Sequence, residues 1–231
     1  MIINSFKSKD DMQFHLIRDV ILQINLVHNF KDTCNILITG GRLFRSNITL
    51  LLEMIDLDKN KNIIFWLTDE RILMKESEKR NDHFISDLVK SRSPRITFES
   101  WKIYDTENEL IYDYLLKFKD ELVKKMNSQS FDISILTIGI DGHIGSNWPN
   151  LVSQIDLDSN FCTQLNLINE FPNRIGFSLN RICKSEKTFL YASGDAKIHI
   201  LNKMISEDKN EYFKLTEIGQ HIDLYLNSGS I

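Results

Sequence analysis

The chain has 231 residues, with 28 Lys and Arg against 32 Asp and Glu, and a formal net charge of −4. Hydrophobic residues make up 42% and charged residues 26%, which is ordinary for a globular protein and excludes a disordered chain or a fibrous repeat. The mild acidity without a basic stripe argues against nucleic acid as the main partner, so an anionic ligand would need a local cluster of cations.

Apolar residues recur at helical spacing after Asp10 and Asp11, and predict a first helix through Phe14, Ile17, Ile21 and Ile24. Residues 35–39 predict a buried strand that ends at Gly40 and Gly41. A second helix follows, with Ser46 as its expected N-cap. Further along, we predict a strand at 62–67, a helix at 81–90 and a strand at 95–98.

In the second half, a long amphipathic helix is predicted at 107–126 and an apolar strand at 131–138. Strands at 174–179 and 187–192 and a helix at 195–206 complete the pattern. Apolar strands without polar alternation, separated by helices, predict a mainly parallel central sheet with helices on both faces, in one α/β domain over residues 1–231. Ligands of such sheets bind outside the carboxyl ends of the strands.

The cysteines and the N-terminus indicate the compartment. Cys34, Cys162 and Cys183 are widely spaced and fit no metal-ligand pattern, so we expect reduced thiols in a cytoplasmic protein. The N-terminal residues do not read as a signal peptide, and no run approaches the ~18 apolar residues of a membrane helix. We expect no membrane partner, and a monomer or small homo-oligomer.

Glycines concentrate after the predicted strands. Six of the nine glycines fall in three such segments, at Gly40 and Gly41, at residues 139–145, and at Gly194. A glycine turn before a helix lets backbone N–H groups approach a phosphate, although a plain turn is an equal alternative for Gly40 and Gly41.

Charged residues follow the strand at 62–67 directly. Asp69, Glu70 and Arg71 form either a solvated loop or a site in which Arg71 binds a phosphate and a carboxylate orients a catalytic group. Arg174, at the start of a later strand, is a further candidate cation. Lys197 lies in the first turn of a helix, where it is either an ordinary surface lysine or the ligand of an anion that offsets its unfavourable interaction with the helix dipole.

The segment from Gly139 to Pro149 is the most informative in the chain. His143 can exchange protons at neutral pH, and Asp141 is close enough in sequence to orient it. Glycines flank both residues at a strand end, which favours a catalytic histidine over a structural one. The remaining histidines, His15, His28, His83, His199 and His221, have no such context.

Together these motifs resemble the 6-phosphogluconolactonase family, which shares a superfamily with glucosamine-6-phosphate isomerase/deaminase. The resemblance spans residues 36–200 and includes Ser77 and Asn81. The motifs that carry it are, in chain order, Gly40-Gly41, Asp69-Glu70-Arg71, Asp141-Gly142-His143, Pro172-x-Arg174-Ile175 and Gly194-x-x-Lys197. Arg174-Ile175 is typical of the lactonases, because the deaminase branch differs there.

The chain departs from the family pattern at two places. Its first loop reads Gly40-Gly41-Arg42, where the family has Gly-Gly-Ser, so Arg42 is either a phosphate ligand or a solvated arginine. After His143, Asn147 is similar to the deaminases' Asn-Glu-Pro, but Trp148 stands where their catalytic glutamate would be.

The resemblance implies a hydrolase of the pentose phosphate pathway that converts 6-phospho-D-glucono-1,5-lactone to 6-phosphogluconate without a metal or organic cofactor. His143 would activate water, Asp141 or Asp69 would orient it, and a phosphorylated sugar lactone would be the partner. The implied phosphate-binding residues are Gly40, Gly41, Arg42, Arg71, Arg174 and Lys197. Two alternatives are an amino-sugar-phosphate isomerase or deaminase with Asp69 as base, and a non-catalytic phosphosugar-binding protein.

Overall fold

The structure is a computed structural model that describes residues 1–56, 60–75, 77–102, 120–121, 130–149, 154–156, 161–164, 173–206 and 212–227. Within these ranges only the main chain is described for Arg42, Leu43, residues 154–156 and residues 161–164. The helix predicted at 107–126 lies outside the described residues, apart from residues 120 and 121.

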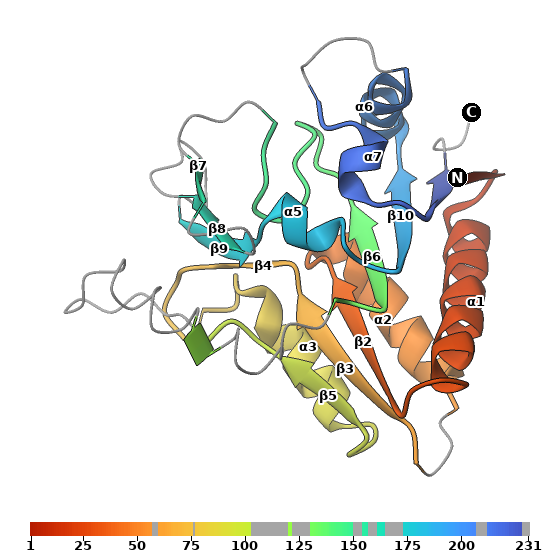
Figure 1. Cartoon of the computed structure of the whole chain (residues 1–231), viewed down its shortest axis with the longest axis vertical. Coiled ribbons are helices and arrows are strands. Elements are labelled where there is room, and N and C mark those ends of the chain that lie inside the picture. Colours follow the sequence, from red (N-terminus) through yellow and green to blue (C-terminus); the bar gives the residue numbers. More distant parts are fainter. Residues whose placement is uncertain are drawn as a thin grey trace.

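The central sheet has seven parallel strands in the order β1-β11-β10-β6-β2-β3-β5 (Figure 1). These strands are β1 (Ile2–Phe6), β2 (Thr33–Ile38), β3 (Asn62–Leu67), β5 (Ile96–Glu99), β6 (Ile133–Thr137), β10 (Lys187–Ser193) and β11 (Ile222–Asn227). Every strand pair in this sheet is parallel. The predicted parallel sheet is therefore confirmed, because the apolar runs supply side chains to a core on both faces.

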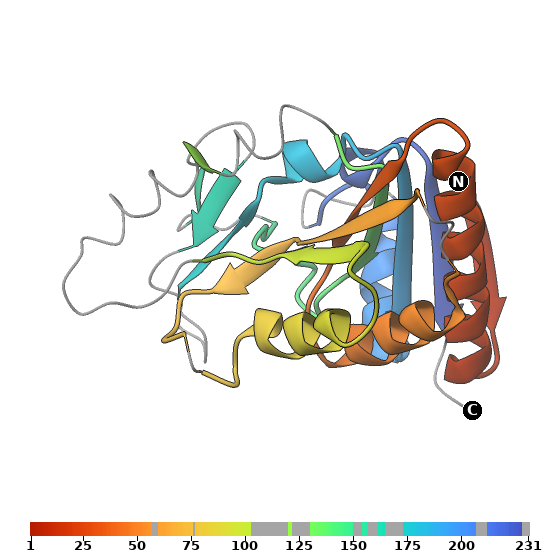
Figure 2. The same cartoon turned by 90° about the horizontal axis from the view of Figure 1, so that it is seen from below.

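The described helices lie on both faces of the sheet. They are α1 (Lys9–His28), α2 (Arg42–Met54), α3 (Asn81–Lys90), α5 (Leu179–Ile182), α6 (Asp195–Ile205) and α7 (Leu215–Ile218). One layer consists of α1, α2 and α3, which contact one another in that order, while α5 and α7 lie together on the opposite side (Figure 2). None of the helices that the structure describes is long and apolar enough to span a bilayer.

The predicted first helix exists as α1, whose buried residues include Met12, Leu16, Ile17, Val20 and Ile24, whereas Phe14 is 49% exposed. The predicted start of the second helix was wrong. The second helix begins at Arg42, about one turn before the predicted N-cap Ser46. Gly41 is its N-cap with φ of 104°, so the chain enters the helix directly from the end of β2.

A second, antiparallel sheet has the order β4-β9-β8-β7. It comprises β4 (Asp69–Arg71), β7 (Gln154–Asp156), β8 (Phe161–Gln164) and β9 (Arg174–Phe177). The strand predicted at 174–179 thus exists at 174–177, but its expected place in the parallel sheet was wrong. Gly176 explains the packing, because a Cβ there would lie only 2.6 Å from the Thr68 carbonyl oxygen. Glycine therefore lets β9 pass close to the junction of β3 and β4.

Candidate functional site

A pocket of about 240 Å³ lies at the carboxyl ends of the central strands, where parallel sheets place their ligands. The segments that follow β2, β3, β6 and β10 all contribute to it, including β4 and the first turn of α6, together with β9. Its lining comprises Thr39, Gly40, Gly41, Asp69, Arg71, Asn81, Thr137, Ile138, Gly139, His143, Gly145, Arg174 and Lys197. Asp69, Arg71 and His143 therefore lie together at these strand ends.

The turn after β2 presents backbone to this pocket. Gly40 and Gly41 line it, and an added Cβ at Gly41 would meet nothing within 4 Å, so the main chain there is open to a ligand. The N–H groups that begin α2 follow directly, and such groups bind anions. Arg42 is the first residue of α2, but its side chain lies outside the described part of the structure.

Two arginines reach the pocket from neighbouring antiparallel strands. Arg71 of β4 stands directly opposite Arg174 of β9. Arg174 pairs with Asp69, whose Oδ2 lies 3.2 Å from Nη1, and the other oxygen of Asp69 accepts from Thr68 at 2.9 Å. Arg71 donates through Nη1 to the Lys79 carbonyl at 2.7 Å and to Oδ1 of Asn81 at 3.0 Å.

Glu70, between Asp69 and Arg71, has a structural position. It is almost fully buried, and its carboxyl accepts backbone N–H groups of Arg71, Asn81 and Asp82 at 2.8–2.9 Å. Burial raises the pKa of Glu70 to about 7, although these hydrogen bonds favour its charged form. The carboxyl thereby joins β4 to the N-terminus of α3, which fixes Arg71 beside Asn81.

His143 and Asp141 form a hydrogen-bonded pair in the loop after β6. Nδ1 of His143 lies 2.5 Å from Oδ1 of Asp141. Burial alone would raise the pKa of Asp141, but hydrogen bonds from His143 and Trp148 outweigh burial and hold this pKa well below its usual value. Because the ionised carboxylate can only accept, Nδ1 of His143 is the donor, and Nε2 is the nitrogen that can accept a proton.

The loop beyond His143 is tied to the second sheet and to α5. Asn147 is buried, donates through Nδ2 to the carbonyl groups of Ile144 and Phe177, and accepts the backbone N–H of Leu179 at 2.8 Å. Trp148 stacks on the imidazole of His143, with ring centroids 4.7 Å apart. Asn147 therefore has a structural position, whereas Trp148 contacts the catalytic candidate itself.

Lys197 enters the pocket from the first turn of α6. Its Nζ donates to Oγ1 of Thr137 at 3.1 Å, and burial lowers its pKa from the ordinary value. A half-buried ammonium group at a helix N-terminus is electrostatically unfavourable until an anion approaches. The position of Lys197 is therefore suited to an anionic ligand.

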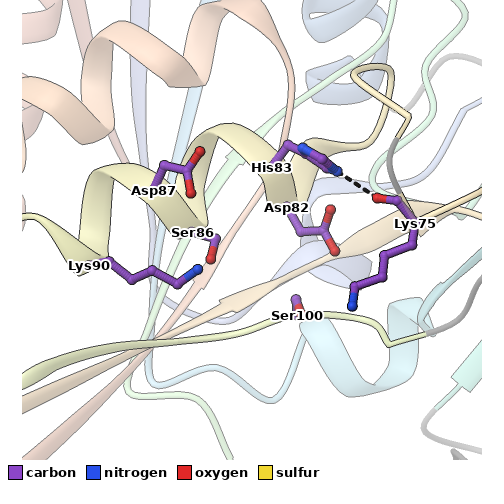
Figure 3. A pocket seen from close by; sticks show the side chains of 7 residues that line it. All are labelled: Lys75, Asp82, His83, Ser86, Asp87, Lys90 and Ser100. Carbon is purple, nitrogen blue, oxygen red and sulfur yellow. Dashed lines mark hydrogen bonds between the residues drawn. The ribbon is translucent and has the colours of Figure 1, made fainter.

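The charge of the lining distinguishes this pocket from a second hollow along α3 (Figure 3). The first is lined by three cations, Arg71, Arg174 and Lys197, and by only one carboxylate, Asp69, so its formal charge is positive. The second has two lysines and two aspartates and a formal charge of zero; its charged residues are Lys75, Lys90, Asp82 and Asp87. Only the first has a surplus charge that favours a phosphate.

Comparison with known proteins assigns the chain to a family. The family model described as glucosamine-6-phosphate isomerases/6-phosphogluconolactonase matches residues 7–218. The chain belongs to the glucosamine-6-phosphate isomerase/6-phosphogluconolactonase family. Its relatives include the probable 6-phosphogluconolactonase 2 of Oryza sativa subsp. indica, 25% identical over 222 residues, which cover 89% of this chain and 77% of that protein.

Another relative is the 6-phosphogluconolactonase of Helicobacter pylori strain J99, 27% identical over 198 residues, which cover 79% of this chain and 82% of that protein. Among solved structures, the 6-phosphogluconolactonase of Thermotoga maritima matches with a TM-score of 0.77 at 17% identity, over 98% of this chain and 99% of that chain. At this low identity, the similarity to the Thermotoga maritima structure shows a shared fold.

The structure brings most of the predicted site residues of this family member together. Gly40, Gly41, Asp69, Arg71, His143, Arg174 and Lys197 all line the pocket, and Asp141 contacts it through His143. Of the two aspartates expected to orient His143, Asp141 makes the contact, whereas Asp69 pairs with Arg174. The described residues include no group of three or more His, Cys, Asp or Glu arranged to hold a metal ion.

Sequence reasoning missed Thr39 and Thr137. Each is a threonine at or next to the carboxyl end of a predicted strand, where ligands of parallel sheets bind, and this position is the signal that would have found them. The Thr137 backbone N–H lies 3.4 Å from Oγ1 of Thr39, and Thr137 in turn accepts from Lys197. The pair therefore joins the ends of β2 and β6 beneath the lysine.

Proposed function

We propose that the protein hydrolyses 6-phospho-D-glucono-1,5-lactone to 6-phosphogluconate, a reaction of the pentose phosphate pathway. The observation that carries the proposal is the placement of the Asp141–His143 pair at the same pocket as Arg71, Arg174 and Lys197. A proton acceptor then faces a cationic surface that can hold a phosphorylated substrate. Relatives of the chain that carry the name 6-phosphogluconolactonase support the choice of substrate.

In this proposal His143 is the general base. Nε2 takes a proton from water as the water oxygen bonds to the lactone carbonyl carbon, while Nδ1–H donates to Asp141. When the tetrahedral intermediate collapses, the bond from that carbon to the ring oxygen breaks. The imidazolium then returns the proton to this oxygen, which becomes a hydroxyl of the acid. General-base catalysis of this kind contributes about 10²–10⁴-fold in rate.

The phosphate would lie against the cations and the start of α2. Arg71 and Lys197 supply charge-assisted hydrogen bonds, and the N–H groups after Gly41 supply neutral donors. Arg174 is a further phosphate contact in this proposal, shared with Asp69. For Arg42, the first residue of α2, the two alternatives of a phosphate ligand and a solvated arginine both stay open. The electrophilic lactone carbon needs no metal ion or organic cofactor for attack by an activated water.

An amino-sugar-phosphate isomerase or deaminase is the less favoured alternative. Such an enzyme would use Asp69 as its proton-transferring base, but Asp69 is bound to Arg174 and Thr68. Both carboxylate oxygens of Asp69 therefore already have partners within the protein. Trp148 also occupies the position at which the deaminases have a glutamate, and its indole stacks on His143.

The test is a comparison of substrates with the purified protein. Hydrolysis of freshly prepared 6-phosphogluconolactone is followed through formation of 6-phosphogluconate, with the spontaneous rate subtracted. Glucosamine 6-phosphate and fructose 6-phosphate are assayed beside it. We expect turnover of the lactone alone. Turnover of glucosamine 6-phosphate would favour the deaminase, and binding of all three without turnover would indicate a non-catalytic phosphosugar-binding protein.

A further inference from the structure

We propose that Trp148 is a positioning residue that holds the Asp141–His143 pair in its catalytic arrangement. The role of His143 as base rests on the proposed function, whereas the contacts of Trp148 with the pair do not. The indole contacts both members of the pair at once.

The contact with His143 is a ring stack. The centroids of the indole and the imidazole are 4.7 Å apart and the planes are inclined by 25°. Offset stacking at this distance is favourable and restricts rotation of the imidazole about its χ2 angle. The side chain of His143 is 28% exposed, so packing by other residues leaves part of the ring unconstrained. The stack therefore limits the direction in which Nε2 points.

The contact with Asp141 is a hydrogen bond from the indole. Nε1 donates to Oδ2 at 2.9 Å, while Oδ1 of the same carboxylate lies 2.5 Å from Nδ1 of His143. The side chain of Asp141 is 53% exposed, so without the indole its outer oxygen would bind water and the carboxylate could turn. The indole thus fixes the plane of the carboxylate, which in turn selects the Nδ1–H tautomer of His143.

Trp148 also contacts the cationic part of the pocket. The guanidinium carbon of Arg174 lies 5.4 Å from the centre of the indole ring, within the range of a cation–π contact. The same side chain thereby joins the proton acceptor to the pair Arg174–Asp69. Trp148 thereby sets the distance between the base and the phosphate-binding cations.

A phenylalanine at position 148 could retain the stack on His143 but has no N–H group to donate to Asp141.

Ring-nitrogen NMR tests the positioning directly, without any substrate. The ¹⁵N shifts of a neutral imidazole report which nitrogen carries the proton, and the signals of His143 are those lost in His143→Asn. We expect the Nδ1–H tautomer in the wild type at alkaline pH and a mixture of both tautomers in Trp148→Phe. The other five histidines report that the variant is folded, because their signals should not move.

Kinetics supply the second readout. Trp148→Phe should lower kcat for the lactone about tenfold, the size of one lost net hydrogen bond, and leave KM within about twofold. Trp148→Leu should lower kcat further, because it also loses the stack. The matched control is Trp66→Phe, which removes a 3.0 Å indole hydrogen bond to Asn35 away from the pocket and should leave kcat unchanged.

The outcomes separate the two proposals. An unchanged His143 tautomer in Trp148→Phe overturns the positioning role, and so does a loss confined to KM, which would make Trp148 a substrate contact. If the wild type does not hydrolyse the lactone, the proposed function fails, and the tautomer measurement alone then decides the role of Trp148.

Discussion

Arg71 and Arg174 face each other directly in the antiparallel pairing of β4 with β9, and both line the pocket. Like charges at directly opposite positions destabilise a pair of strands. Asp69 neutralises Arg174 at 3.2 Å, while Arg71 binds the neutral oxygens of Lys79 and Asn81. The arrangement costs stability in the free protein, and in the proposed function the phosphate of the substrate would offset this cost.

The first prediction concerns this anion. Arg71→Ala should raise KM for the phosphorylated lactone about tenfold to a hundredfold, since a lost charge-assisted hydrogen bond costs roughly 1.5–3 kcal/mol. Activity toward unphosphorylated gluconolactone should stay the same, because that substrate has no phosphate. Steady-state kinetics with both substrates provide the measurement, and Lys90→Ala, in the second hollow, is the control.

Equal losses of Arg71→Ala on the two lactones would contradict a phosphate contact. They would assign Arg71 to the support of α3 through Asn81 and Lys79.

A second prediction concerns Lys197, whose half-buried charge should lower the stability of the fold and favour binding of a phosphorylated ligand. Burial lowers the pKa of Lys197 from 10.5, so the charged lysine destabilises the folded state below that folded pKa. Lys197→Met should raise the free energy of unfolding by about 0.5–2 kcal/mol while weakening binding of 6-phosphogluconate. The stability difference between Lys197→Met and the wild type should shrink as pH rises toward 10.5, because Lys197 in the folded wild type loses its charge before that pH. Chemical denaturation and calorimetric titration measure the two effects; a less stable variant would disprove this account of Lys197.

A third prediction concerns the buried carboxyl of Glu70. Its pKa is raised by burial to about 7, above the ordinary 4.5, so the folded state binds more protons than the unfolded state between these values. The contribution of Glu70 to the free energy of unfolding is therefore greatest at low pH and falls as pH rises toward 7. Glu70→Gln cannot accept all three backbone N–H groups, so it should be less stable than the wild type. Because glutamine does not titrate, the difference in free energy of unfolding between the two proteins should narrow from pH 5 to pH 8. A gap that widens over this range would contradict the shift.

The fourth prediction uses Gly139, where a Cβ would lie 2.2 Å from Nδ1 of His143 and 2.4 Å from Oδ1 of Asp141. Gly139→Ala should displace this pair and lower kcat about a hundredfold, as expected for a misplaced catalytic group. Gly219→Ala is the matched control, because its Cβ would approach Thr188 at 2.8 Å outside the pocket. Both variants should remain folded by circular dichroism. A normal kcat in Gly139→Ala would show that the Asp141–His143 geometry is not critical.

Five of the seven strands of the parallel sheet could be predicted, because β2, β3, β5, β6 and β10 each read as an apolar run followed closely by glycine or a charged residue, whereas β1 and β11 were not predicted. Residues 62–67 became β3 without change, and residues 35–39 and 131–138 differ from β2 and β6 by two residues at most at either end. The second sheet could not be predicted, since β4 consists of three charged residues, Asp69 to Arg71. Polar side chains there are stabilised by tertiary contacts that the local sequence does not reveal.

Most residues that line the pocket could be predicted from the sequence, but most of the contacts between them could not. Asp141 and His143 are two residues apart, and this short separation indicated their contact. Asp69 and Arg174 are 105 residues apart, and the antiparallel register that joins them depends on the close approach at Gly176. The hydrogen bond of Trp148 to Asp141 likewise depends on the path of the loop, so the sequence showed the departure at Trp148 without its structural consequence.

In the proposed mechanism, His143 activates water for attack on a phosphorylated lactone. The most direct measurement is the lactonase rate of His143→Asn above the spontaneous rate, together with its affinity for 6-phosphogluconate. We predict that kcat falls by about 10²–10⁴-fold, the contribution of a general base, while product affinity stays within about twofold because the cations are untouched. A variant that retains most of its rate above the spontaneous reaction would contradict the claim and assign water activation to another group.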